Sequence, residues 1–369
     1  MRGKIFGVGL SCLLVLSVTS CKEEKEEDNN ALGFNTTELL TNYSSNLILP
    51  KYEVLSTKVA ILKTNSVAFV ASPTIANLHV LRGSLFEAEF AYQACTSFEF
   101  GPANTYSLRS ILSTYPASES IIDQNITNGN FNLYAAGNIA AKGFPAMGYL
   151  IFGSNKTDQE IIDLFTIDAE VVSRKNYLTA LVEQIATVVN QVNNQWVSGG
   201  YSEVFINANG TAVGSSVSLI LNAMVLDFER FIRDGKVGIP LGIRSLGIPN
   251  PEKVEAHYSH KSLELVQESV LEYKKCFNGI STTEINGMGV DDYLNYEDAE
   301  NITQKINTQL DLITEKLNLL NGPLSEDVVS NKNAVKAVYD EMQKLIVSLK
   351  VEVPSALSVL ITYQDSDGD

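Results

Sequence analysis

The stretch Gly143-Phe144-Pro145-Ala146-Met147-Gly148-Tyr149-Leu150-Ile151-Phe152-Gly153 interrupts a chain that is otherwise patterned for helices. The alanine-rich residues 133–141 before it predict a helix, and the stretch itself is apolar enough to lie in a core. A glycine in a helix interior costs about 1 kcal/mol and a proline about 3 kcal/mol. We therefore predict an irregular turn at residues 143–153, which serves either the structure or a binding site.

The segments on both sides of this stretch show helical periodicity. Apolar residues recur at spacings of three and four, which places them on one face of a helix. No segment shows sustained strand alternation. The fold class that we predict is all-α, with two similar four-helix-bundle domains. The apolar stripes are Leu78, Leu81 and Leu85; Leu178, Leu181, Ile185, Val188 and Val192; Ile302, Ile306, Leu310, Ile313, Leu317 and Leu320; and Val335, Val338, Met342 and Leu345.

The helical pattern breaks at Val197-Ser198-Gly199-Gly200, and this break is the predicted boundary between the domains. The N-terminal bundle would comprise residues 33–197 and the C-terminal bundle residues 198–369. In each half a long predicted helix, at 72–98 or 216–233, runs into an aromatic residue and then a turn rich in glycine and proline. We interpret this similarity as a weak internal duplication. Further helices are predicted around 107–114 and at 251–277, and residues 123–132 are predicted to be a loop.

The N-terminus has the pattern of a bacterial lipoprotein signal. A basic start and an apolar segment from Ile5 to Val18 precede Val18-Thr19-Ser20-Cys21, which resembles a lipobox. Residues 1–20 would be the signal peptide, Cys21 the lipidated residue, and 21–32 a disordered acidic tether. The alternative is an ordinary signal peptide with an incidental cysteine. We expect an outer-membrane lipoprotein of the bacterial cell envelope, facing the periplasm or the surface and anchored to the membrane through Cys21.

Composition and charge exclude one class of partner. Hydrophobic residues make up 45% of the 369 residues, which is enough for a core, and the net charge is -16. Nucleic acid is not an expected partner, because its phosphates require a basic surface. Cys95 and Cys276 could pair in an oxidising envelope, but both fall in helical patterns, so we expect buried free thiols.

Only one pair of side chains suggests a metal. His257 and His260 are three residues apart on a predicted helix and would share one face. They are weak candidates, since no third ligand is apparent, and a polar helix end is the alternative. No catalytic set can be assembled from the motifs in the sequence.

Several stretches together resemble the imelysin-like family over residues 33–363. These are Lys236-Val237-Gly238-Ile239-Pro240-Leu241-Gly242, Pro251-Glu252-Lys253-Val254-Glu255-Ala256-His257-Tyr258-Ser259 with Ser262, Phe98-Glu99-Phe100-Gly101-Pro102, and residues 143–152. The resemblance implies two related four-helix bundles with a site in the cleft at their interface. It also implies a bacterial envelope protein of a family often linked to iron acquisition.

The family carries a metallopeptidase label that rests largely on a G-x-H-x-x-E motif. In this chain the motif aligns with residues 143–148, where Pro145 and Gly148 replace the histidine and the glutamate. We therefore predict no catalytic residue and assign the matching positions to ligand binding in the cleft. These positions are Glu99, Gly143, Pro145, Gly148, Tyr149, Lys236, Arg244, Glu255, Tyr258, Ser259 and Ser262.

The leading hypothesis is a non-enzymatic, lipid-anchored binding protein that serves iron or haem uptake, with iron or haem as a possible ligand and iron-uptake proteins as possible partners. The first alternative is a metal-dependent peptidase with an atypical ligand set, such as Glu99, Glu255, His257 and His260. The second is a structural or adhesive surface protein with a degenerate site.

Overall fold

The computed structural model describes residues 33–363. The predicted signal peptide, the lipidated Cys21 and the acidic tether lie outside these residues. Gly33 and Phe34 belong to an N-terminal unit that ends at Phe34, and a compact unit begins at Asn35. The compact unit is all-α, and its described residues contain no strand beyond an isolated bridge between Ile280 and Asn286.

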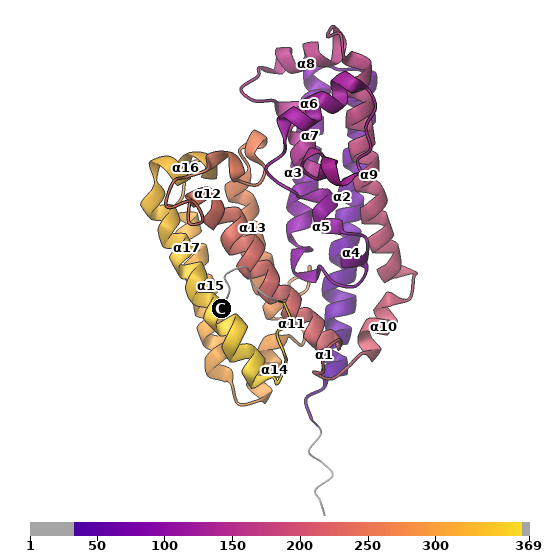
Figure 1. Ribbon diagram of the computed structural model, residues 1–369. Coiled ribbons are helices and arrows are strands. Elements are labelled where there is room, and N and C mark those ends of the chain that lie inside the picture. The colour runs from indigo at the N-terminus through magenta and orange to yellow at the C-terminus, as the bar shows by residue number, and fades with distance from the viewer. Residues whose placement is uncertain (1–32, 364–369) are drawn as a thin grey trace, which may run out of the picture. The chain divides into compact units, whose positions relative to one another are not determined.

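A long N-terminal helix is the centre of the first group of helices. It consists of α1 (Thr36–Asn42), the π-helical η1 (Tyr43–Ile48) and α2 (Leu49–Ala71). By length and composition, this helix could cross a membrane. However, α2 packs against α3 (Ile75–Gln93) and α9 (Val171–Val197), and its Tyr52, Leu55, Leu62 and Phe69 side chains are buried. It is therefore a core helix (Figure 1).

The predicted apolar stripes of the first group are confirmed. The leucines at 78, 81 and 85 are buried on α3, and the five predicted core residues of α9 are buried as well. Short elements complete this group around the three long helices. They are η2 (Thr96–Phe98), α4 (Pro102–Thr105), α5 (Leu108–Leu112), α6 (Glu119–Asn128), η3 (Ala136–Ala141), α7 (Gly143–Phe152), α8 (Asp158–Thr166) and α10 (Tyr201–Asn207).

The second group of helices is built from the later part of the chain (Figure 1). Its main contacts join α15 (Glu300–Asn318) to α17 (Lys332–Val347) and to α13 (Ser262–Phe277). The apolar stripes predicted at residues 302–320 and 335–345 are buried, apart from half-buried Ile302. Its other elements are α11 (Ser216–Leu226), η4 (Asp227–Gly238), α12 (Ile239–Leu241), η5 (Pro251–Lys253), η6 (His257–Ser259), α14 (Val290–Tyr296), α16 (Leu324–Ser330), η7 (Ser348–Glu352) and α18 (Val353–Ala356).

The irregular turn predicted at residues 143–153 is wrong, because residues 143–152 form helix α7. Pro145 lies in the first helical turn, where its missing N–H has no acceptor to lose. Gly143 begins the helix with φ of 73°, a conformation that suits glycine. The helix packs between α3 and α9, and burial of its apolar residues offsets the low helix propensity of its glycines.

The residues before α7 also differ from the prediction. Residues 133–141 do not form an α-helix, because most of their side chains are exposed and offer no apolar face to bury; only a 3₁₀ segment forms at Ala136–Ala141. The predicted loop at 123–132 is largely helical, since it overlaps α6. Ile122 and Ile126 lie one turn apart on α6, and both are fully buried.

The helix predicted to end at residue 233 continues through the predicted turn. A π-helical segment, η4, carries it from Asp227 to Gly238, and α12 extends it to Leu241. Two glycines permit close packing on this segment. A Cβ at Gly235 would lie 3.2 Å from the Tyr115 hydroxyl, and one at Gly238 would lie 2.7 Å from the Tyr339 ring. Segments of π-helix are rare and are frequent at functional sites.

The helix predicted at 251–277 begins eleven residues later than expected, at Ser262. The side chains of residues 254–256 are buried. In addition, left-handed backbone angles, which a helix cannot contain, occur at Ala256 and His260. The boundary at residues 197 and 198 stays a prediction, although α9 does end at Val197. Cys95 and Cys276 are free and buried, as expected.

Gly143→Ala should destabilise the fold by at least about 2 kcal/mol. Its Cβ would lie 2.4 Å from the backbone oxygens of Ile111 and Leu112, at a positive φ. Gly148→Ala is the matched control, because its Cβ would meet only the Tyr258 ring at 3.5 Å. The control should be neutral or more stable by up to about 1 kcal/mol. Urea denaturation measures both changes, and equal effects would contradict this account of α7.

Candidate functional site

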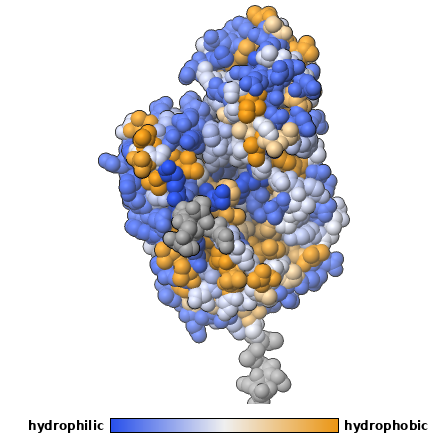
Figure 2. Space-filling view, in the orientation of Figure 1, coloured by the Kyte–Doolittle hydropathy of each residue, from blue (hydrophilic) through white to orange (hydrophobic). Residues whose placement is uncertain are grey.

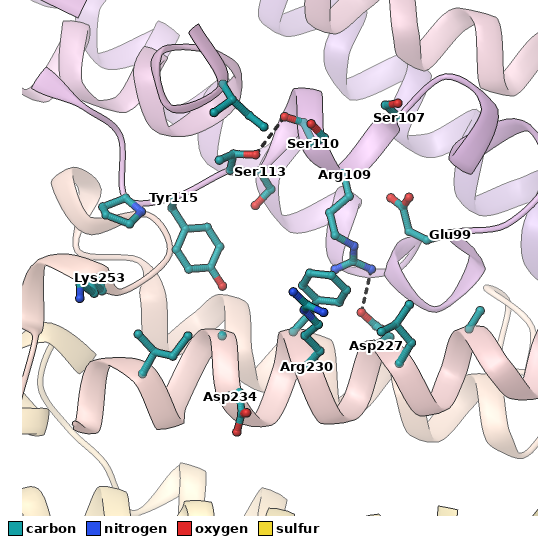
Figure 3. Close-up of a pocket in the computed structure, with 18 of the residues that line it drawn as sticks. Glu99, Ser107, Arg109, Ser110, Ser113, Tyr115, Asp227, Arg230, Asp234 and Lys253 are labelled. Carbon is teal, nitrogen blue, oxygen red and sulfur yellow. Dashed lines mark hydrogen bonds and ion pairs between the residues drawn. The ribbon is translucent and has the colours of Figure 1, made fainter. Parts of the chain in front are cut away.

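A cavity of about 1080 Å³ lies between the two groups of helices. One wall comes from residues 99–116, and the other comes from residues 223–253, largely from η4. The face in Figure 2 is hollowed between the groups, with hydrophilic residues around the hollow. Figure 3 shows Arg109 from one wall and Arg230 from the other pointing toward one another, whereas Asp234 points away from the space between them. The volume suits an organic ligand rather than a single ion.

Arg109 on α5 forms the floor of this cavity together with Asp227, the first residue of η4. The Arg109 Nη2 donates to Asp227 Oδ1 and to the backbone oxygen of Thr96, both at 2.8 Å. The hydroxyls of Thr96 and Ser97 donate to the other oxygen of Asp227, at 2.9 and 3.0 Å. The guanidinium also lies 3.8 Å from the centre of the Phe231 ring. Asp227 is 2% exposed, so its charge depends on these partners.

Glu99 lines the cavity beside Arg109 (Figure 3). The Tyr92 hydroxyl donates to Glu99 Oε1 at 2.9 Å. Burial raises the pKa of Glu99, while Arg109 and the hydrogen bond from Tyr92 oppose that rise. Burial also raises the pKa of Tyr115 well above its ordinary value, so this cavity residue keeps its hydroxyl proton at neutral pH.

Three cations reach the cavity from the second group: Arg230, Arg244 and Lys253. The Arg244 Nη2 donates to Asp234 Oδ2 at 2.7 Å, and Arg233 binds the other oxygen of Asp234 at 2.8 Å. Burial alone would raise the pKa of Asp234, but the hydrogen bonds from Arg233 and Arg244 hold it below its ordinary value. Asp234 is therefore a neutralised carboxylate, shared by two guanidinium groups.

Behind the cavity, a buried ion pair of the second group is linked to the first group by hydrogen bonds. Lys236 pairs with Glu255, and both side chains are less than 10% exposed. Lys236 Nζ also donates to Gln93 Oε1 at 2.8 Å, and Ser113 Oγ donates to Glu255 Oε1 at 2.8 Å. Ser262 donates to the backbone oxygen of Glu255. Three of the predicted ligand residues, Lys236, Glu255 and Ser262, therefore belong to this buried network and do not line the cavity.

Glu89 lies in the same buried region and was not predicted from the sequence. It is 4% exposed, and its Oε2 has no hydrogen-bond partner within residues 33–363. Burial, then the nearby Glu255, raises its pKa well above the ordinary range. The sequence does carry a signal for this carboxyl, because Glu89 follows Leu85 by one helical turn and so belongs to the apolar stripe of α3.

The other predicted site residues lie away from the cavity. The Tyr149 and Tyr258 rings are 5.5 Å apart, and Gly148 packs against Tyr258. Pro145 and Tyr258 line a crevice of only about 10 Å³. Ser259 Oγ donates to the backbone oxygen of Ala256. Gly143 lies at the start of α7 and packs against backbone, so of the predicted residues only Glu99 and Arg244 line the cavity.

His257 and His260 do not share a helical face, contrary to the prediction. They lie in a turn, where His260 has a φ of 58° and is exposed. Burial, then His260, lowers the pKa of His257. Among residues 33–363 no group of three or more histidine, cysteine, aspartate or glutamate side chains is placed to hold a metal ion. The set of Glu99, Glu255, His257 and His260 is therefore not assembled.

The functional residues that the sequence reasoning missed are Arg109, Tyr115, Asp227, Arg230 and Lys253. Asp227 carries a recognisable signal, because it follows the apolar run of α11, and a charge in such a run needs a buried partner. Nothing in the sequence indicates that the partner would be Arg109, which is 118 residues away in the chain. Together these side chains offer cations and hydroxyl donors to a bound ligand.

Lys236→Met should destabilise the protein by about 3–5 kcal/mol, because it leaves the buried Glu255 carboxylate without its cation. Lys336→Met is the matched control. Its ion pair with Asp340 is about half exposed, and loss of such a pair costs about 1 kcal/mol or less. The free energy of unfolding in urea gives both values. A loss for Lys236→Met no larger than that of the control would show that the buried pair is not a structural constraint.

Glu89→Gln should increase stability at pH 8 and have less effect at pH 5. The raised pKa of Glu89 means that the folded state keeps a proton that the unfolded chain releases above about pH 4.5, so wild-type stability falls as the pH rises. Glutamine removes this dependence, and we expect a gain of about 1 kcal/mol or more at pH 8. Urea denaturation at pH 5 and at pH 8 measures this change in the free energy of unfolding. Glu53→Gln, at an exposed position, should show no such difference.

Comparisons with known proteins agree with the fold. A search of curated proteins found no match. An iron-regulated protein A precursor, as it is described, from Parabacteroides distasonis ATCC 8503 has a similar structure, with a TM-score of 0.71 and 17% identity, covering 87% of this chain and 95% of that one. An imelysin-like protein from Psychrobacter arcticum 273-4 has a TM-score of 0.68 and 13% identity, covering 88% and 96%.

The sequence comparison is independent of these structural similarities. Residues 48–351 match the family described as Imelysin, Peptidase M75. The match includes both walls of the cavity and helix α7. This chain therefore belongs to the imelysin family.

Proposed function

We propose that this protein is a lipid-anchored envelope protein that binds a ligand in the cavity between its two groups of helices and serves iron or haem uptake without catalysing a reaction. The observation that carries the proposal is the cavity itself, with its fixed Arg109 floor and polar groups from both walls. The anchor would be Cys21, after a signal peptide at residues 1–20. The link to iron rests on family membership and on the iron-regulated protein of similar structure.

Two features favour binding over peptide hydrolysis. Pro145 and Gly148 stand where the family motif has histidine and glutamate, and neither side chain can ligate a metal or activate water. Glu255, which the alternative ligand set requires, is already bound by Lys236 and Ser113. The cavity, in contrast, offers donors on rigid helices, which is the usual form of a small-molecule site.

Filling the cavity tests the proposal. Ser110 lines it, so Ser110→Phe should reduce the affinity for an iron ligand by at least about tenfold, because the new ring occupies the binding volume. Ser198→Phe, on an exposed position outside the cavity, is the matched control. Isothermal titration of the mature protein with haemin and with ferric citrate measures binding. The proposal fails if neither of the two binds, or if Ser110→Phe binds as tightly as the control.

A parallel assay tests the enzymatic alternative. The mature protein is incubated with a mixture of peptides and zinc, and the products are followed by mass spectrometry. Cleavage that disappears in His257→Ala would overturn the non-enzymatic part of the proposal.

A further inference from the structure

The charges that line the cavity are not balanced. Four lining side chains are cationic and three are carboxyl groups. Asp227 is neutralised by Arg109, and Asp234 is neutralised by Arg233 and Arg244. The third carboxyl, Glu99, accepts a hydrogen bond from the Tyr92 hydroxyl at 2.9 Å and lies beside Arg109. The carboxyl groups of the cavity are thus already satisfied by protein partners, and they have little left to offer a cation.

Two of the four cations have no such partner. Within residues 33–363, neither Arg230 nor Lys253 forms an ion pair, although both line the cavity. Arg230 is exposed and Lys253 is half-buried; in Figure 3 Lys253 lies near Tyr115, and Arg230 points from η4 toward Arg109. An excess of positive charge here contrasts with the net charge of -16 for the whole chain. Uncompensated cations in a cleft raise the local concentration of anions.

The neutral groups of the cavity fit an anion with an organic body. The hydroxyls of Ser107 and Ser110 make no hydrogen bond within the described residues and can donate to a carboxylate. Ile139, Leu226 and Ile239 line the same space with apolar surface. Cations and hydroxyls beside apolar side chains are the expected surroundings of a carboxylate-bearing organic molecule.

We propose that the cavity takes an anionic iron complex that carries free carboxylates, and that Arg230 and Lys253 bind those carboxylates. This inference rests on the proposed function and specifies its ligand class. A bare metal cation would meet uncompensated positive charge and no available carboxylate, so it should not bind here. Haem propionates and a ferric hydroxycarboxylate both have the required chemistry, and separate titrations distinguish them.

The experiment titrates mature protein with ferric citrate, haemin, citrate alone and zinc alone. Ferric citrate or haemin should bind. Zinc should not compete with either of them for the cavity. Lys253→Met and Arg230→Gln should each weaken binding of the iron complex about tenfold, because each removes one charge-assisted hydrogen bond. Lys175→Met is the matched control, since Lys175 forms no ion pair among the described residues and lies outside the cavity. Binding should also weaken as the salt concentration rises.

The outcomes separate this inference from the proposed function. If no iron species binds, the proposed function fails first. If binding is abolished by Ser110→Phe but is unchanged in both Lys253→Met and Arg230→Gln, the cavity site stands and the anion assignment is overturned. Competition of zinc with the iron complex would also overturn the anion assignment. Tighter binding of citrate alone than of the iron complex would overturn the assignment of an iron complex as the ligand.

Discussion

The buried pair of Lys236 and Glu255 is the constraint on which the relation between the two groups of helices depends. Taking two charges out of water costs several kcal/mol per ion, and the cost is recovered only where the remaining donors and acceptors are satisfied. From the first group, Gln93 accepts a hydrogen bond from Lys236, and Ser113 donates one to Glu255. A displacement of one group relative to the other would therefore leave the buried pair without its hydrogen bonds to Gln93 and Ser113.

The need of buried charges for hydrogen-bonding partners also shapes the cavity. Asp227 lies at the start of a π-helical segment, and Arg109, Thr96 and Ser97 all bind its carboxylate. The carboxylate is held on one wall and the guanidinium on the other, so this contact joins the two walls. Gly235 and Gly238 let the π-helical wall approach tyrosines on its two neighbours. The walls of the cavity are thus joined where buried charges are satisfied, and within residues 33–363 Arg230 and Lys253 line it without an ion pair.

Helix α7 shows how packing maintains a helix with two glycines and a proline. Gly143 still provides the positive φ and the close approach to the backbone of α5. Pro145 is accommodated in the first turn, and Gly148 lets the Tyr258 ring lie against the helix. These positions serve packing, and none of the three lines the cavity. Family membership therefore identifies the scaffold, but the ligand has to be argued from the cavity.

The sequence by itself determined the all-α class and the buried face of each long helix, because the 3.6-residue period acts locally and is visible in the order of residues. It failed where tertiary packing outweighed local preference: residues 143–152 are helical despite two glycines and a proline, and residues 133–141 are not α-helical despite their alanines. The partners of Asp227 and Glu255, and with them the cavity, were decided only by the tertiary structure. Those contacts join residues far apart in the chain, and satisfying a buried charge is a property of three-dimensional proximity that no local pattern encodes.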